Sequence, residues 1–310
     1  MAAARGRKSN GADGGARRPG GPTIALAQHA PILGDVRRNV RLQVEWARRA
    51  AARGADLVVF PELSLTGYRL QDLVSEVALR LDRRGPLEPL LEASRRIGIV
   101  TGLVEESEGH RFYNVAVHLE AGRIRHVHRK VYLPTYGMFE EGRYFASGDT
   151  FAAYRSAAGR MGLLVCEDAW HPASALVLAQ DGADLVLILS NGPSQAVGVA
   201  GGPRNHETWL DLSRVTAQMQ TVFVAFVNRV GVEDGVGFFG ASMIVDPLGR
   251  VVASAPTLNE DLVLAPLDRA LLRRARTYYP LLRDERLPVL AREIERLSAT
   301  PQARRGPGGT

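Results

Sequence analysis

Short apolar runs alternate with amphipathic stretches along the chain, beginning near Thr23. An apolar run of about four to eight residues is typical of a buried strand, whereas apolar residues three and four apart indicate one face of a helix. Predicted strands cover residues 23–29, 57–60, 99–104, 113–119, 124–129, 161–166, 184–189, 222–227, 241–246 and 250–254. Predicted helices cover residues 35–54, 71–81, 87–97, 173–180, 205–219 and 268–275.

Strands that alternate with helices predict an α/β fold, and a hairpin predicted at residues 241–254 indicates that its sheets are mixed. Two similar strand–helix halves favour two sheets packed face to face with helices outside, a four-layer α-β-β-α sandwich. We assign this domain to residues 23–275. Residues 1–22 form a predicted disordered basic tail, and residues 276–310 form a C-terminal extension that is predicted to be partly disordered. The Gly-rich stretch 195–203 is predicted to be mobile.

Composition favours a cytoplasmic globular protein. Apolar residues make up 45% of the 310 positions, which is enough for a large core. The single cysteine excludes an intramolecular disulfide and suits a reducing compartment. The sequence has no apolar stretch of about 18 residues and no apolar signal core at its N-terminus, so we predict no membrane partner.

The basic excess of the chain lies at its ends. The formal net charge is +6, but residues 1–22 carry five basic residues against one acidic residue, and residues 300–310 carry two basic residues. Basic, Gly-rich ends are typical of solvated tails, which cannot bury enough apolar surface to fold. We therefore predict no specific nucleic-acid partner, and at most weak binding through the tail.

The one cysteine, Cys166, lies where a predicted strand turns into a predicted helix. Unpaired N–H groups at the start of a helix carry partial positive charge, which favours ionisation of a thiol there. A thiolate is a strong nucleophile. The alternative is that Cys166 is a buried and inert apolar side chain.

Three predicted strand ends carry reactive groups, namely Glu62, Lys130 and Cys166. In α/β folds, sites lie outside the carboxyl ends of the strands. Taken alone, Glu62 fits a solvated loop carboxylate and Lys130 fits a surface lysine. Taken together, the three residues supply a base, a cation and a nucleophile, which is a recognisable catalytic set.

Four motifs occur in order along the chain: Pro61–Tyr68 (PELSLTGY), Lys130–Pro134 (KVYLP), Phe139–Phe145 (FEEGRYF) and Cys166–Trp170 (CEDAW). Together they resemble the nitrilase superfamily of carbon–nitrogen hydrolases, over about residues 23 to 270. The resemblance implies the same four-layer sandwich. It also implies a homo-oligomer, because the superfamily commonly builds dimers and larger assemblies.

The resemblance further implies a catalytic triad of Glu62, Lys130 and Cys166. It implies a second glutamate between the lysine and the cysteine, which the sequence context places at Glu141, with Glu140 as the fallback. A thiolate on Cys166 would attack an amide carbonyl, Lys130 would hold the oxyanion, and Glu62 would transfer protons. Because an unpaired charge is costly in a dry pocket, we expect Lys130 to lie between the two glutamates.

Several residues are similar to the glutaminase domains of glutamine-dependent NAD synthetases. That similarity gives four substrate-binding candidates, Tyr68, Tyr136, Glu167 and Trp170. Asn191 is a fifth candidate, although its sequence context Ser-Asn-Gly-Pro departs from the Ser-Ala-Ser-Pro usual in those domains. We find no synthetase domain and no phosphate-cradling Gly-rich motif, so ammonia would be released and not channelled. Residues 228–231 and 238–242 resemble stand-alone amidases.

We therefore predict a hydrolase that cleaves a small linear carboxamide or an N-carbamoyl compound to acid and ammonia through a cysteine thioester. Its partners would be the amide substrate and water, with no cofactor. A nitrilase acting on a nitrile and a glutaminase are the alternative enzymes, and a catalytically silent scaffold is the alternative outside enzymes. His126 and His128 share one strand face, but they have no third ligand at a telling spacing, so no metal site is predicted.

Overall fold

The computed structural model describes residues 21–82, 85–194 and 204–299. The predicted disorder of residues 1–22 and the predicted mobility of residues 195–203 therefore lie almost entirely outside the described residues. The same holds for the last residues of the C-terminal extension. Within the described ranges, no helix has both the length and the apolar character that crossing a membrane requires.

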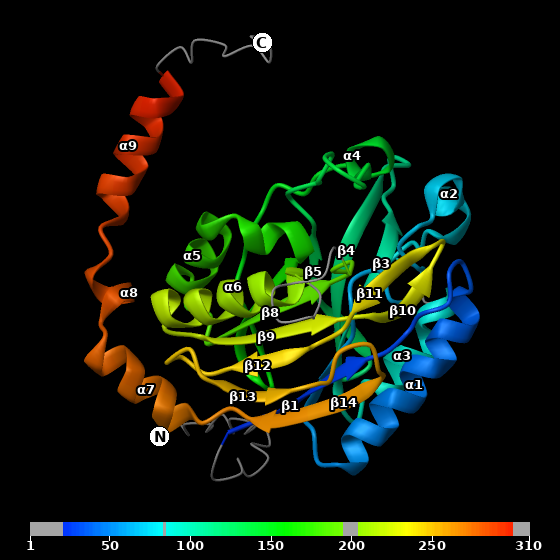
Figure 1. Cartoon of the computed structure of the whole chain (residues 1–310), viewed down its shortest axis with the longest axis horizontal. Coiled ribbons are helices and arrows are strands. Elements are labelled where there is room, and N and C mark those ends of the chain that lie inside the picture. The colour runs from blue at the N-terminus through cyan, green and yellow to red at the C-terminus, as the bar shows by residue number, and fades with distance from the viewer. Residues whose placement is uncertain (1–20, 83–84, 195–203, 300–310) are drawn as a thin grey trace, which may run out of the picture.

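The first half of the chain, joined by one late strand, builds a six-stranded mixed sheet (Figure 1). Its strand order is β14-β1-β2-β3-β4-β5. The neighbours β1–β2 and β2–β3 are parallel, and the other neighbours are antiparallel. The strands are β1 (Thr23–Gln28), β2 (Leu57–Val59), β3 (Gly98–Glu106), β4 (Phe112–Glu120), β5 (Arg123–Arg129) and β14 (Asp261–Pro266).

The second half builds another six-stranded mixed sheet, in the order β13-β12-β9-β8-β7-β6. Here β7, β8 and β9 are parallel, and the outer pairs are antiparallel. The strands are β6 (Tyr154–Ser156), β7 (Gly159–Val165), β8 (Leu185–Ser190), β9 (Phe223–Asn228), β12 (Met243–Val245) and β13 (Val251–Ser254). A separate hairpin consists of β10 (Val230–Glu233) and β11 (Val236–Phe239).

Helices cover the outer face of each sheet (Figure 1). The covering helices are α1 (Val36–Ala52), α3 (Glu88–Ala93), α5 (Pro172–Gln180) and α6 (Arg204–Gln220). α1 and α3 pack on the first sheet, and α5 and α6 pack on the second. As predicted, Asp35 caps α1, its carboxylate accepting a 2.9 Å hydrogen bond from the Arg38 N–H. The predicted α-β-β-α sandwich is thus confirmed.

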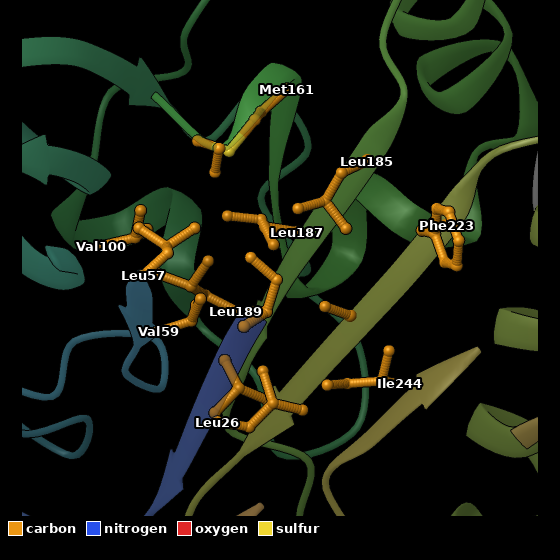
Figure 2. Packing of buried hydrophobic residues seen from close by; sticks show 14 of the residues in the cluster. Leu26, Leu57, Val59, Val100, Met161, Leu185, Leu187, Leu189, Phe223 and Ile244 are labelled. Atoms are coloured by element: carbon orange, nitrogen blue, oxygen red, sulfur yellow. The ribbon is translucent and has the colours of Figure 1, made fainter. Parts of the chain in front are cut away.

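The main core lies between the two sheets (Figure 2). Alternate residues of β1 explain how a strand can be apolar throughout: Ile24 and Leu26 face the second sheet, whereas Ala25 and Ala27 face the helices. Across the interface, apolar side chains of β7, β8 and β9 meet those of β1, β2 and β3. Burying one Val, Leu or Ile contributes about 1.5–3 kcal/mol, so this core fixes the separation of the sheets.

Two predicted helices, at 71–81 and 87–97, are much shorter in the structure. The first is reduced to a 3-10 turn, η1 (Gln71–Leu73), and α2 (Val74–Val77); the second follows a 3-10 turn, η2 (Gly85–Leu87), as α3. The chain leaves α2 because Leu79 pairs with β3, its N–H donating to the Val104 carbonyl at 2.8 Å. The predictions missed β6, β10, β11 and β14, which are short or lie at the edge of a sheet or in the separate hairpin.

The C-terminal extension is helical as far as the structure describes it. It contains α7 (Arg269–Tyr278), α8 (Leu281–Asp284) and α9 (Leu287–Ala299), and α7 runs through the predicted domain end at residue 275. α9 projects away from the sandwich (Figure 1) and has no buried residue. It exposes a row of apolar side chains, Leu287, Leu290, Ile294 and Leu297. The homo-oligomer stays a prediction.

Buried neutral histidines predict acid sensitivity. His118 on β4 is fully buried, and neither ring nitrogen has a hydrogen-bond partner among the described residues. Burial lowers the pKa of His118 from 6.5 to about 3, helped by His126 and Arg125. Since the unfolded chain binds the proton first, stability is lost as pH falls below about 6.5.

We expect the free energy of unfolding to fall by about 3 kcal/mol from this histidine alone between about pH 6.5 and pH 4, at about 1.4 kcal/mol per pKa unit. Urea titrations of the wild type and of His118→Phe over that range measure it. The free energy of unfolding of the variant should depend less steeply on pH than that of the wild type. Equal slopes for the two proteins would contradict this assignment.

Candidate active site

Local backbone geometry places Glu62 and Lys130 at the ends of strands. Glu62 follows β2, and the Phe60 N–H donates to the Val100 carbonyl at 2.8 Å, which holds the turn against β3. Gly102 of β3 is required here, because a Cβ at that position would overlap the Leu63 nitrogen. Lys130 directly follows β5. Since the two sheets pack face to face, the end of β7 can meet these residues from the other side.

The Lys130 ammonium lies between two carboxylates. Its Nζ donates to Glu62 Oε1 at 2.9 Å and to Glu141 Oε1 at 2.8 Å. Exposure is 0% for Lys130, 1% for Glu62 and 5% for Glu141, which begins the short helix α4 (Glu141–Tyr144). Burial by itself lowers the pKa of Lys130, but the carboxylates of Glu141 and Glu62 outweigh it and hold that pKa well above its usual value. Lys130 is therefore a buried cation.

Glu141 experiences opposing influences. Burial raises the pKa of Glu141 above the ordinary value, the ammonium of Lys130 opposes that shift, and the carboxylate of Glu62 adds to it. One cation serves two carboxylates here, so the cluster carries one uncompensated negative charge when both are ionised. The predicted second glutamate, Glu141, thus contacts the ammonium of Lys130. Glu140 has no such contact among the described hydrogen bonds and ion pairs.

Two asparagines hold the Glu62 carboxylate. Asn114 Nδ2 donates to Glu62 Oε1 at 2.7 Å, and the Asn191 N–H donates to Glu62 Oε2 at 2.9 Å. The Asn191 side chain also donates, through Nδ2, to the Glu62 carbonyl at 2.9 Å. The role of Asn191 in substrate binding stays a prediction, since its Nδ2 is occupied and its buried Oδ1 has no partner among the described residues. Sequence reasoning missed Asn114, whose only signal is an amide within the apolar run of β4.

Cys166 begins a 3-10 turn, η3 (Cys166–Trp170), directly after β7. Its backbone is left-handed, with φ of 44°, an uncommon conformation for a residue with a Cβ. The residue is half-buried, and Ser190 Oγ donates to its Sγ at 3.6 Å. A strained residue between a strand and a helix presents its side chain at the end of the sheet.

The structure corrects the expectation that this thiol ionises easily. Burial raises the pKa of the Cys166 thiol, the carboxylate of Glu62 raises it further, and Lys130 lowers it. Burial is the largest of these influences. η3 is only one short turn and α5 does not begin until Pro172, so no long helix starts at the thiol. The resting thiol is therefore neutral, and a nucleophilic role for Cys166 would require a base to remove its proton.

Tyr68 supports the cluster from a second direction. Its hydroxyl donates to Glu141 Oε1 at 3.0 Å. Burial raises the pKa of Tyr68 well above its usual value, and Glu141 adds to that shift, so the phenol stays protonated and can donate. The N–H groups of Tyr68 and Arg69 donate to Glu233 at 2.8 and 2.6 Å. Glu233, which the predictions missed, pairs in turn with the buried Arg229.

The other predicted substrate contacts form an exposed group. Tyr136 is 57% exposed, and its hydroxyl lies 3.0 Å from both oxygens of Glu167. Burial of the hydroxyl, together with the hydrogen bond to Glu167, raises the pKa of Tyr136 to about 12. Trp170 is 41% exposed and packs edge-on against Trp209, with the ring centroids 5.5 Å apart. Tyr136 and Trp170 are therefore exposed, and Glu167, directly after Cys166, is partly exposed.

The two candidate metal ligands do not converge. His128 Nε2 hydrogen bonds Asp168 at 2.8 Å, whereas His126 stacks on Tyr154 with the ring centroids 4.0 Å apart. Across the part of the chain that the structure describes, no group of three histidine, cysteine or acidic side chains could hold a metal ion.

A family model described as carbon-nitrogen hydrolase matches residues 23–277. A glutamine-dependent NAD(+) synthetase from Thermotoga maritima is 33% identical over 249 residues, which cover 79% of this chain and 42% of that protein. An (R)-stereoselective amidase from Pseudomonas sp is 34% identical over 276 residues, which cover 88% of this chain and 94% of the amidase.

A solved structure shows similar coverage. It is a variant of the amidase from Nesterenkonia sp. AN1 with acrylamide added at its active-site cysteine. It superposes with a TM-score of 0.72 and 25% identity, covering 88% of this chain and 99% of that one. The chain spans less than half the length of the synthetase relative but nearly the whole of both amidases. By its family match and these relatives, the chain belongs to the carbon–nitrogen hydrolase family.

Proposed function

We propose that the protein hydrolyses a small linear carboxamide or an N-carbamoyl compound to acid and ammonia, with Glu62, Lys130 and Cys166 as its catalytic triad. The observation that carries this proposal is the buried Lys130 ammonium, bonded to Glu62 at 2.9 Å and to Glu141 at 2.8 Å. Such a fixed cation is suited to an oxyanion, and Cys166 is the cysteine whose pKa this cation lowers.

In the first half of the proposed reaction, Glu62 removes the proton from the Cys166 thiol. The thiolate attacks the carbonyl carbon, and the carbonyl oxygen becomes an oxyanion. The Lys130 ammonium and the Glu167 backbone N–H hold this oxygen. Glu62 then gives its proton to the nitrogen, the C–N bond breaks, and ammonia leaves a thioester on the sulfur.

In the second half, a water molecule replaces ammonia. Glu62 takes a proton from the water as it attacks the thioester carbonyl, and Lys130 again holds the oxyanion. Collapse of this intermediate breaks the C–S bond, releases the acid and returns the proton to sulfur. Glu141 supports the cycle by holding Lys130 charged, and Tyr68 supports it by fixing Glu141 with its 3.0 Å hydrogen bond.

Substrate recognition is assigned to Tyr136, Glu167 and Trp170, which we call the rim. These side chains are at least partly exposed, unlike the buried cluster around Lys130. A carboxylate beside exposed aromatic rings favours a substrate that carries an ammonium group. This rim is the observation that supports glutamine as a second candidate substrate. The amidase relatives, which this chain matches along nearly their whole length, favour an amidase over a glutaminase.

Ammonia release from a substrate panel tests the proposal. The panel contains linear aliphatic amides, N-carbamoyl amino acids, L-glutamine and the matching nitriles. The proposal expects turnover of at least one amide or carbamoyl compound, with the acid as the second product. Turnover of nitriles alone would favour a nitrilase, and no turnover across the panel would favour the silent scaffold.

Glu167→Gln is expected to raise KM about tenfold for a substrate with an ammonium group and to change kcat less than about threefold. The reason is that this carboxylate would bind the substrate head equally in the ground state and the transition state. Initial rates over a range of substrate concentrations separate the effect on KM from the effect on kcat. Tyr136→Phe is the matched control: it removes only the hydroxyl contact to Glu167 and should raise KM less. A large fall in kcat with unchanged KM would place Glu167 in the chemistry instead.

A further inference from the structure

We propose that Asp168 is a positioning residue that sets Lys130 against Cys166 during amide hydrolysis, a role that rests on the function proposed above. Asp168 lies in η3, two residues after Cys166, and its side chain is fully buried. An ionised carboxylate at 0% exposure is costly unless donors surround it. The donors around Asp168 come from the segments that carry Lys130 and Cys166.

One oxygen of Asp168 binds the chain beyond Lys130. The backbone N–H groups of Val131 and Tyr132, the two residues after Lys130, both donate to Asp168 Oδ1 at 3.0 Å. His128, two residues before Lys130, approaches Oδ2 through its Nε2 at 2.8 Å. Because an ionised carboxylate can only accept, the His128 Nε2 carries the hydrogen. The carboxylate thus accepts hydrogen bonds from the chain on both sides of Lys130.

The other oxygen also binds the chain just before the cysteine. Val165 N–H donates to Asp168 Oδ2 at 3.0 Å. This bond closes the turn in which Cys166 adopts its left-handed backbone. Burial alone raises the pKa of Asp168, but the hydrogen bonds from His128, Val165 and Tyr132 outweigh it and hold that pKa below its usual value. The Asp168 carboxylate, which we call the clamp, is therefore ionised.

Asp168 is the polar link between the two segments. Among the described residues, every hydrogen bond that joins residues 128–132 to residues 165–170 ends on its carboxylate. A stacked contact between Tyr132 and His171, with centroids 3.5 Å apart, also joins the neighbouring chain. Loss of the carboxylate should thus loosen the placement of Lys130 without unfolding the domain.

The proposed chemistry is sensitive to that placement. The oxyanion forms on the carbonyl that Cys166 attacks, and the Lys130 ammonium must already face this position when the intermediate forms. A misplacement of about 1 Å can cost about 100-fold in rate. Lys130 also lowers the pKa of the Cys166 thiol, so a looser lysine leaves less thiolate at a given pH.

Asp168→Asn tests the clamp, because an amide keeps the shape of the side chain but has only one accepting oxygen. We expect kcat for an amide to fall about 10- to 100-fold with KM changed less than about threefold. We also expect alkylation of Cys166 by iodoacetamide, followed by mass spectrometry, to slow about threefold or more at a given pH. His128→Phe, which removes one of the four donors, should lower kcat less.

Asp246→Asn is the matched control. Asp246 is also a buried aspartate that holds a turn, accepting hydrogen bonds from the N–H groups of Leu248 and Arg250, and it lies between β12 and β13. The Asp246→Asn variant should be less stable than the wild type. Its kcat and its rate of Cys166 alkylation, each corrected for the folded fraction, should not change. Equal losses of kcat and of alkylation rate in Asp168→Asn and Asp246→Asn would overturn the proposal. So would an Asp168→Asn variant with the wild-type kcat and the wild-type alkylation rate. If the wild type hydrolyses no amide, the proposed function fails, and the alkylation comparison alone decides the clamp.

Discussion

Replacing Cys166 with alanine is expected to lower kcat for amide hydrolysis at least about 10⁴-fold, because removal of the nucleophile removes the covalent route. Binding and the fixed charge of Lys130 would remain, so KM should change little. Ammonia release under saturating amide measures the effect. Mass spectrometry of the wild type mixed rapidly with substrate should find an acyl group on residue 166 and none on the alanine variant.

Ser190→Ala is the matched control for Cys166→Ala. Ser190 is buried beside Cys166 and donates to its sulfur at 3.6 Å, but the proposed mechanism gives it no step. That hydrogen bond helps to lower the pKa of the thiol, so its loss should cost less than about tenfold in kcat. Substantial ammonia release by Cys166→Ala, beyond about one part in a hundred of the wild-type rate, would refute the thioester mechanism.

The fold was predictable where strands are buried on both faces. β2, β7 and β8 are apolar at almost every position, because one face meets the other sheet and the other face meets helices. The same logic placed Glu62, Lys130 and Cys166 at strand ends. β2 and β5 belong to the first sheet and β7 belongs to the second, so the face-to-face packing of the sheets is needed to bring the three ends together. The periodicity could not show that Leu79 leaves its helix to pair with β3, since this choice depends on a partner 25 residues away.

The supporting residues could not be predicted for a different reason. Asn114, Glu233 and Asp168 act through hydrogen bonds to distant segments, and an isolated polar residue in a strand or turn does not reveal its acceptor or donor. Asn191 shows the same limit: the sequence made it a candidate for substrate binding but did not show that its N–H and Nδ2 bind Glu62. The ionisation of Cys166 was misjudged because burial, which no sequence pattern reports at a turn, dominates the thiol pKa.

Replacing Lys130 with methionine is expected to damage catalysis and stability together. The loss of one oxyanion donor typically costs about 10² to 10³ in kcat, and here the same residue also lowers the pKa of the Cys166 thiol. Removing one partner of a buried ion pair costs about 3–5 kcal/mol, because the remaining carboxylates of Glu62 and Glu141 stay buried without their cation. Ammonia release and urea unfolding measure the two losses on the same preparations.

The stability loss should have a pH signature. Burial and Glu62 already raise the pKa of Glu141, and Lys130 is the group that opposes them. Without Lys130 the pKa of Glu141 rises further, and a group whose pKa is raised by folding stabilises the protein at low pH and loses that contribution as pH rises. Lys130→Met should therefore be more destabilised relative to wild type at about pH 8 than at about pH 5.

The double variant Lys130→Met with Glu141→Gln separates the two roles of the lysine. Glutamine keeps the shape of Glu141 but carries no charge, so one of the two stranded carboxylates is removed. The double variant should recover about half of the lost stability and lose most of the pH dependence, because like charges no longer face each other in a dry site. It should remain inactive, since no cation is left to hold the oxyanion. Recovery of activity together with stability would show that Lys130 serves only to neutralise Glu141, and not to stabilise the reacting carbonyl.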